Sequence, residues 1–259
     1  MSLRNVSWTV ASMVAAACWP GIDCENASAQ ESAATAVAEI YLDEPAPAPR
    51  PVVVTTGKLQ DKYEEGALRI EREVLKMSDD QIVNHGLFTE YYPNGQKFAE
   101  GTYKNGVHDG PWTFWHPNGQ ICKKVTFKDG RADGAWEVYR EDGTLLAKRA
   151  YKNNLREGAW FMYYDDGTTV RVEDTYVDGV HDGVGRVYYA NGKVQREMSF
   201  KKGQLDGVMT EWDESGRKIA EVSFKEGKRH GRFVLYRADG SAVEQMYQEG
   251  RLAPSAAGG

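Results

Sequence analysis

Acidic side chains recur at one fixed position of this chain, and paired carboxylates can hold a divalent cation or act as general acid and base. Five of six such positions, each directly before a glycine, are acidic, and the sixth is histidine: Asp109, Asp133, Glu157, Asp182, Asp206 and His230. If these residues lie two strands apart in a sheet, successive carboxylates are about 10 Å apart. That distance is too long for one calcium ion, or for the roughly 5–9.5 Å separation of a glycosidase pair. The series therefore predicts turn chemistry, or an acidic rim that selects basic segments of a partner.

The histidines do not form a metal site either. Five are present: His85, His108, His116, His181 and His230. His108 and His181 both lie in the sequence Val-His-Asp-Gly, but they are three repeat units apart. By strand spacing, the distance between them is about 29 Å. We predict polar turn residues, no metal and no cofactor. The sequence also lacks a Ser/His/Asp arrangement on a recognisable turn, a phosphate loop, a cysteine pair and a His-x-x-x-His, so it does not predict an enzyme.

Aromatic rings are the other residues that could do chemistry, by stacking on a ligand or on one another. One column stands five residues after a recurring glycine: Tyr91, Trp115, Tyr139, Tyr163, Tyr188, Trp212 and Tyr236. A second column precedes the next turn: Tyr103, Phe127, Tyr151, Tyr176, Phe200, Phe224 and Tyr247. The fifth-position column either packs along the array as a ladder or forms an exposed strip that binds a partner.

A 24-residue repeat positions these columns. The opening glycines are Gly86, Gly110, Gly134, Gly158, Gly183, Gly207 and Gly231. Residues two and four after them alternate as apolar positions, for example Trp112 and Phe114, and this period of two predicts strands. The fifth-position rings fall on the opposite strand face, because their offset is odd. No repeat carries an isolated cluster of titratable residues, which also argues against catalysis.

Asn-Gly and Asp-Gly texts after the fifth-position rings are strong hairpin signals. Each unit is therefore predicted as strand, tight turn, strand and looser turn. The fold class is all-β: an elongated, curved array of about seven 24-residue antiparallel β-hairpins, about 65–70 Å long by strand spacing. Dimerisation through the open face or through an edge strand is a further expectation.

These units resemble the MORN repeat family in its bacterial variant form. The matching text is Gly134-Ala-Trp-Glu-Val-Tyr139 with Asp142-Gly143, and Phe200-Lys-Lys-Gly203-Gln-Leu-Asp-Gly207. The resemblance covers residues 86–252 and implies antiparallel hairpin repeats that serve as protein-interaction or membrane-proximal scaffolds. It brings no catalytic residues, and some bacterial relatives are labelled antitoxin-like.

Three departures from the repeat are visible. Gly185 stands where a tryptophan or phenylalanine is expected, which weakens the apolar stripe of that unit. One extra residue lies between Gly167 and Gly179, and one is missing between Gly240 and Gly250. The extra and missing residues are expected to bulge or shorten a strand.

The two ends of the chain have other compositions. Residues 1–29 are predicted as a signal peptide, with Arg4, an apolar stretch and cleavage after Ala29; a lipid anchor at Cys18 is the alternative. Residues 30–56 are rich in proline and alanine and are predicted as a disordered linker. Residues 57–85 are a degenerate capping repeat, 86–252 the seven repeats, and 253–259 a disordered tail.

The expected function is binding, not catalysis. The net charge of −6 has both signs mixed along the chain, so no basic patch indicates nucleic acid. We expect an exported scaffold, periplasmic, secreted or at the cell surface, that binds another protein along a sheet face through the fifth-position column and the acidic series. One alternative is a cell-wall glycan or lipid surface, an envelope or membrane-surface component, stacked on the same rings. Another is a cytosolic, antitoxin-like inhibitor.

Overall fold

The computed structural model describes residues 51–254. The predicted signal peptide and lipid-anchor cysteine, the linker up to residue 50, and tail residues 255–259 lie outside this range. Residues 51–254 contain no helix, and so none of their segments is a helix that could cross a bilayer.

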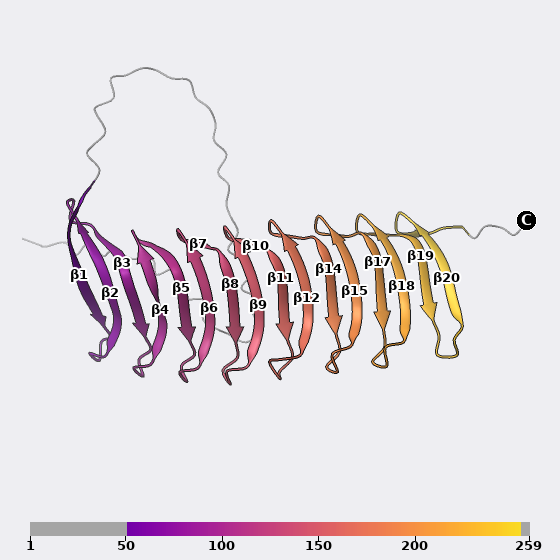
Figure 1. Cartoon of the computed structure of the whole chain (residues 1–259), viewed down its shortest axis with the longest axis horizontal. Coiled ribbons are helices and arrows are strands. Elements are labelled where there is room, and N and C mark those ends of the chain that lie inside the picture. Colours follow the sequence, from indigo (N-terminus) through magenta and orange to yellow (C-terminus); the bar gives the residue numbers. More distant parts are fainter. Residues whose placement is uncertain (1–50, 255–259) are drawn as a thin grey trace, which may run out of the picture. The chain divides into compact units, whose positions relative to one another are not determined.

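The described residues form one antiparallel sheet of 21 strands, in which the hairpins succeed one another in chain order (Figure 1). The long strands are β1 (Val53–Lys62), β2 (Leu68–Met77), β3 (Ile82–Tyr91), β4 (Lys97–Lys104), β5 (Val107–Trp115), β6 (Ile121–Lys128), β8 (Gly134–Tyr139), β9 (Leu145–Lys152), β11 (Gly158–Tyr163), β12 (Val170–Val177), β14 (Gly183–Tyr188), β15 (Val194–Lys201), β17 (Gly207–Trp212), β18 (Lys218–Lys225), β19 (Lys228–Tyr236) and β20 (Ala242–Gln248). Two-residue strands extend the junctions: β7 (Arg131–Ala132), β10 (Leu155–Arg156), β13 (Val180–His181), β16 (Gln204–Leu205) and β21 (Arg251–Leu252). The predicted all-β hairpin array is confirmed.

The predicted order of tight and looser turns is wrong, because the tight turns join one repeat to the next. At these junctions both central residues have positive φ, as for Asp129 (48°) and Gly130 (78°), which is the requirement of a type I′ turn. The turn inside each hairpin is longer. Tyr92 N–H donates to the Gln96 carbonyl across it, and only its glycine, Gly95 (φ 83°), takes the left-handed conformation.

The extra residue and the missing residue of the two irregular repeats change different parts of the hairpin. The extra residue lengthens the turn inside its hairpin and does not bulge a strand. Across this turn Tyr164 N–H donates to the Thr169 carbonyl, five residues later, whereas in the next hairpin Tyr189 N–H donates to the Lys193 carbonyl, four residues later. The missing residue coincides with the loss of a β-bulge. Six repeat hairpins shift register just before the fifth-position residue, and the β19–β20 pair does not.

The sheet has two faces that the alternation of side chains separates. The ladder face carries the residues two and four after each opening glycine, together with the second aromatic column. Its best-buried part contains Phe88, Ala99, Trp112, Phe114 and Val125, and Cys122 is buried in the same cluster. The column face carries the fifth-position rings.

One domain boundary needs correction. Residues Val53–Thr56, predicted as the end of the linker, belong to strand β1. The preceding prolines led to the linker assignment, but the β-branched run Val52–Thr56 favours a strand. The segment predicted as a capping repeat folds as most of β1, all of β2 and the beginning of β3.

Candidate functional site

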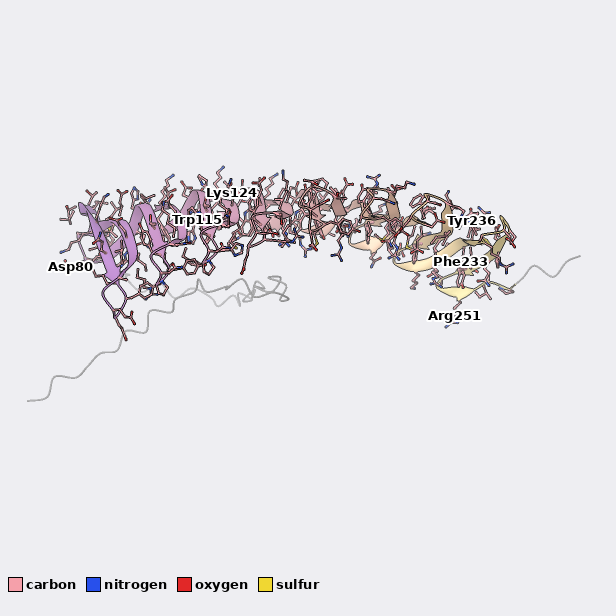
Figure 2. The ribbon with its side chains drawn as sticks, turned by 90° about the horizontal axis from the view of Figure 1, so that it is seen from below. Asp80, Trp115, Lys124, Phe233, Tyr236 and Arg251 are labelled. Atoms are coloured by element: carbon pink, nitrogen blue, oxygen red, sulfur yellow. The ribbon has the colours of Figure 1, made fainter. Side chains whose placement is uncertain are left out.

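The predicted fifth-position column lies at the end of the first strand of every repeat hairpin, and all seven rings are half-buried. Figure 2 labels two members, Trp115 and Tyr236, on the upper side of the ribbon with Lys124, whereas Phe233 lies toward the lower side. The odd offset that separates positions 233 and 236 along β19 accounts for this difference. The predicted separation of the two faces is therefore confirmed.

Charged side chains surround the rings of this column. The Lys97 ammonium lies 5.6 Å from the Trp115 ring centroid, within cation–π distance. Tyr139 donates its hydroxyl to Glu137 (2.7 Å), and burial together with this bond raises the pKa of Tyr139 to about 12. Tyr188 bonds in the same way to Glu173 (2.6 Å). The rings are thus positioned by ionic neighbours.

The alternative prediction is that the fifth-position rings pack on one another as a ladder. In the structure, the rings on the opposite face of the sheet pack in this way. Successive fifth-position rings are two strands apart, about 10 Å, and the strands between them carry lysine and glutamate. On the ladder face, every long strand from β3 to β12 carries a ring. Ring contacts with centroid distances of 3.7–6.5 Å run without a break from Phe88 to Phe200, through Trp112, Trp136 and Trp160.

The acidic series has a structural role in the junction turns. Each of these carboxylates accepts a backbone N–H from a left-handed turn residue about 20 positions later, as Glu157 does from Asp178 (3.0 Å) and Asp182 does from Lys202 (3.1 Å). The pairs for Asp109, Asp133 and Asp206 are equivalent. Turn chemistry therefore accounts for these residues, and an acidic rim that selects a basic partner stays a prediction.

One region of the ladder face breaks the repeat. Gly185 lacks the ring of its counterparts, and Asp174 and His181 take the space: a Cβ on Gly185 would lie 2.8 Å from Asp174 Oδ1. The His181 Nε2 atom lies 3.1 Å from Asp174 Oδ1. The Arg156 guanidinium lies over Tyr176, 4.7 Å from its ring centroid. The prediction that no repeat carries a titratable cluster is wrong here.

Burial affects both acid–base groups of this cluster. Desolvation raises the pKa of Asp174 and lowers the pKa of His181, and the attraction between the two groups offsets part of each shift. The two groups lie within ion-pair distance, and the His181 ring stacks on Phe200, with centroids 3.7 Å apart. The cluster fills the place of a missing aromatic ring with a polar pair.

A series of hydrogen bonds between successive repeats was not predicted from the sequence. In the first five repeats, the residue after the fifth-position ring donates to the carbonyl of the next fifth-position residue: Tyr92 to Trp115, His116 to Tyr139, Arg140 to Tyr163, Tyr164 to Tyr188 and Tyr189 to Trp212. The recurrence of donors at this position was the available signal. Because a carbonyl only accepts, His116 carries its proton on Nε2. The series fixes the spacing of the column.

The prediction of polar turn residues is wrong for His108 and His116, whereas His85 bonds to the turn residue Asn105. His116 is buried in the series above. His108 stacks on Phe127 with centroids 5.0 Å apart and lies edge-on to Trp112 at 4.3 Å. Within residues 51–254 no group of histidine, cysteine and carboxylate side chains could hold a metal ion.

We expect stability to fall as the pH is lowered from 7 to 5, with His108 responsible for part of the fall. Burial lowers the pKa of His108 in the folded chain. The unfolded chain therefore binds more protons below its ordinary pKa of 6.5, and the free energy of unfolding decreases in that range. Urea unfolding at pH 5, 6 and 7 measures this slope. The slope should be smaller in His108→Phe, and equal slopes would contradict the assignment.

The geometry defines a class of protein: a single open sheet of repeated hairpins that present two side-chain columns. Comparison with protein families agrees, since the MORN repeat variant model matches residues 84–105, 109–129, 132–153 and 182–202. The chain carries MORN repeat variant repeats across residues 84–202, a repeat type that is typically non-catalytic. The remaining hairpins have the same strand pattern in the structure. Comparison with curated proteins gives no match.

Proposed function

We propose that this protein is a non-catalytic scaffold that binds another protein along the column face. The single observation that carries the proposal is the spacing of half-buried rings on one side of an open sheet, one ring for each of the seven repeat hairpins. Export, and the partner role of the acidic series, are parts of this proposal that rest on the sequence.

The two faces differ in what they offer to a partner. On the ladder face the rings already contact one another, so their faces are largely used. On the column face the rings stand apart, and lysine and glutamate side chains lie between them. Two apolar residues of this face, Leu87 in β3 and Val208 in β17, are also exposed. Aromatic rings with adjacent apolar and charged groups are typical of protein-binding surfaces.

We expect Trp115→Ala and Trp212→Ala to weaken partner binding at least about tenfold, because aromatic anchors carry much of the energy of an interface. A photo-crosslinking amino acid at position 91 of the full chain first identifies the partner in the native host. Titration of that purified partner then gives the dissociation constants of the wild type and of both variants.

Met162→Ala is the matched control, since Met162 is apolar and exposed but lies on the ladder face. Its affinity should equal that of the wild type. Loss of binding in Met162→Ala with normal binding in the tryptophan variants would move the site to the ladder face. Binding that resists high salt and needs a glycan in place of a protein would favour the stacking alternative over a charged partner.

A further inference from the structure

Strand β1 forms an open edge of the sheet. It pairs with β2 on one side, and Figure 1 shows it as the first strand of the array, at the indigo end. By contrast, β2 pairs with β1 and with β3. Along an edge strand, alternate backbone N–H and C=O groups point away from the neighbour and can accept another strand.

The side chains in the first half of this edge do little to prevent such pairing, whereas Lys58, Asp61 and Lys62 charge the second half. Val52, Val53 and Val54 are 64, 51 and 62% exposed, and Thr55 and Thr56 complete a run of five β-branched residues without a charge. Protein edges are usually blunted by charges, prolines or bulges. Here the first half of the strand has high β propensity and is available on both faces.

We propose that a second copy of this chain pairs with β1, antiparallel and about a two-fold axis, so that one continuous sheet spans two protomers. In the register that places Gly57 opposite Gly57 of the other copy, Lys58 faces Thr56 and Asp61 faces Val53. No charged side chain then lies directly opposite another, which removes the like-charge penalty of cross-strand pairs. A Cβ at Gly57 would meet nothing within 4 Å, so the axis is sterically open.

The two-fold arrangement fits better than a head-to-tail arrangement. At the far edge, the two-residue strand β21 already pairs with the end of β20, and Pro254 follows it. A head-to-tail contact would also add copies without limit, whereas a two-fold contact closes at two protomers. The proposal is independent of the partner bound on the column face, because β1 precedes the first ring of that column.

The molar mass of the full chain, measured by light scattering over a wide range of concentrations, tests the proposal. We expect a dimer in the wild type and at least about tenfold weaker dimerisation in Val54→Lys, because a charge on an edge opposes pairing. Val177→Lys is the matched control, since Val177 is an exposed strand valine far along the sheet. A chain that stays monomeric, or a dimer that Val54→Lys leaves intact, would overturn the proposal, and so would a mass that grows without limit.

A cysteine placed on the axis tests the register. Cα atoms of opposed antiparallel residues lie about 4.5–5.5 Å apart, within the range of a disulfide. With Cys18 and Cys24 changed to serine, Gly57→Cys should give a disulfide-linked dimer under mild oxidation. Lys62→Cys, opposite Val52 in this register, should crosslink much less. Equal crosslinking at both positions would reject the two-fold pairing through β1.

Discussion

Replacing Trp112 with alanine should lower the free energy of unfolding by about 3–5 kcal/mol, the usual cost of removing a buried tryptophan. Trp112 is only 2% exposed and lies in the best-buried part of the ladder face. Its ring contacts Phe88, Tyr103 and Phe127, and its indole N–H donates to the Thr102 carbonyl (3.1 Å). Removing the ring therefore opens a cavity and leaves that carbonyl without this donor.

Trp115 provides the matched control, because it lies on the same strand three residues later but on the column face. It is half-buried, so Trp115→Ala should cost clearly less than Trp112→Ala. Urea denaturation of both variants, followed by circular dichroism, measures the difference. If Trp115→Ala destabilises the chain as much as Trp112→Ala does, the column is part of the core, and its assignment to partner binding loses its support.

The hairpin array could be predicted because its causes are local. Alternation along a strand sets which side chains share a face, so Trp112 and Trp115 are separated without any knowledge of the tertiary structure. Positive φ at the recurring glycines similarly marks the turns. Repetition of these short-range signals fixed the number of hairpins and their antiparallel order.

The turn types could not be assigned in the same way, because Asn-Gly fits two different turns. In the hairpin loop Asn94 keeps a negative φ, and its side chain accepts the Gln96 N–H (3.0 Å) and donates to the Pro117 carbonyl of the next repeat (3.0 Å). At the junction, Asn105 takes φ 51° before Gly106. The contact with the neighbouring repeat selects between them, and a single repeat unit does not contain that information.

The candidate site was predicted in part. The odd offset of the fifth-position residues is enough to predict which face of the sheet carries their rings. The charged groups around the rings come from the neighbouring strand, as in the hydrogen bond between Tyr188 and Glu173, which are 15 residues apart in sequence. The acidic positions recur visibly in the sequence, yet their backbone partners appear only when consecutive turns are brought side by side. The Asp174–His181 pair was missed because Gly185 was treated only as a loss, whereas the structure fills the space it leaves.

Gly101→Ala should destabilise the chain by about 3 kcal/mol, the upper part of the usual range for overpacking. Gly101 lies in β4, and the indole of Trp112 lies directly on its backbone. A Cβ at this position would lie 2.2 Å from Cδ2 and 2.4 Å from Cγ of Trp112. The indole is enclosed by other rings, so it cannot move aside without losing their contacts. The corresponding change at Gly57, where nothing lies within 4 Å, should stay within about 0.5 kcal/mol of the wild type.

The double variant Gly101→Ala, Trp112→Ala separates this steric cause from a general intolerance of β4 to alanine. With the indole removed, the added methyl group enters the space that the ring leaves, so Gly101→Ala should be nearly neutral in the Trp112→Ala background. The coupling between the two changes should then be about 3 kcal/mol, at the high end for contacting residues. Additive effects in urea denaturation would show that the indole does not rest on Gly101, and that the ladder face is packed differently at its best-buried point.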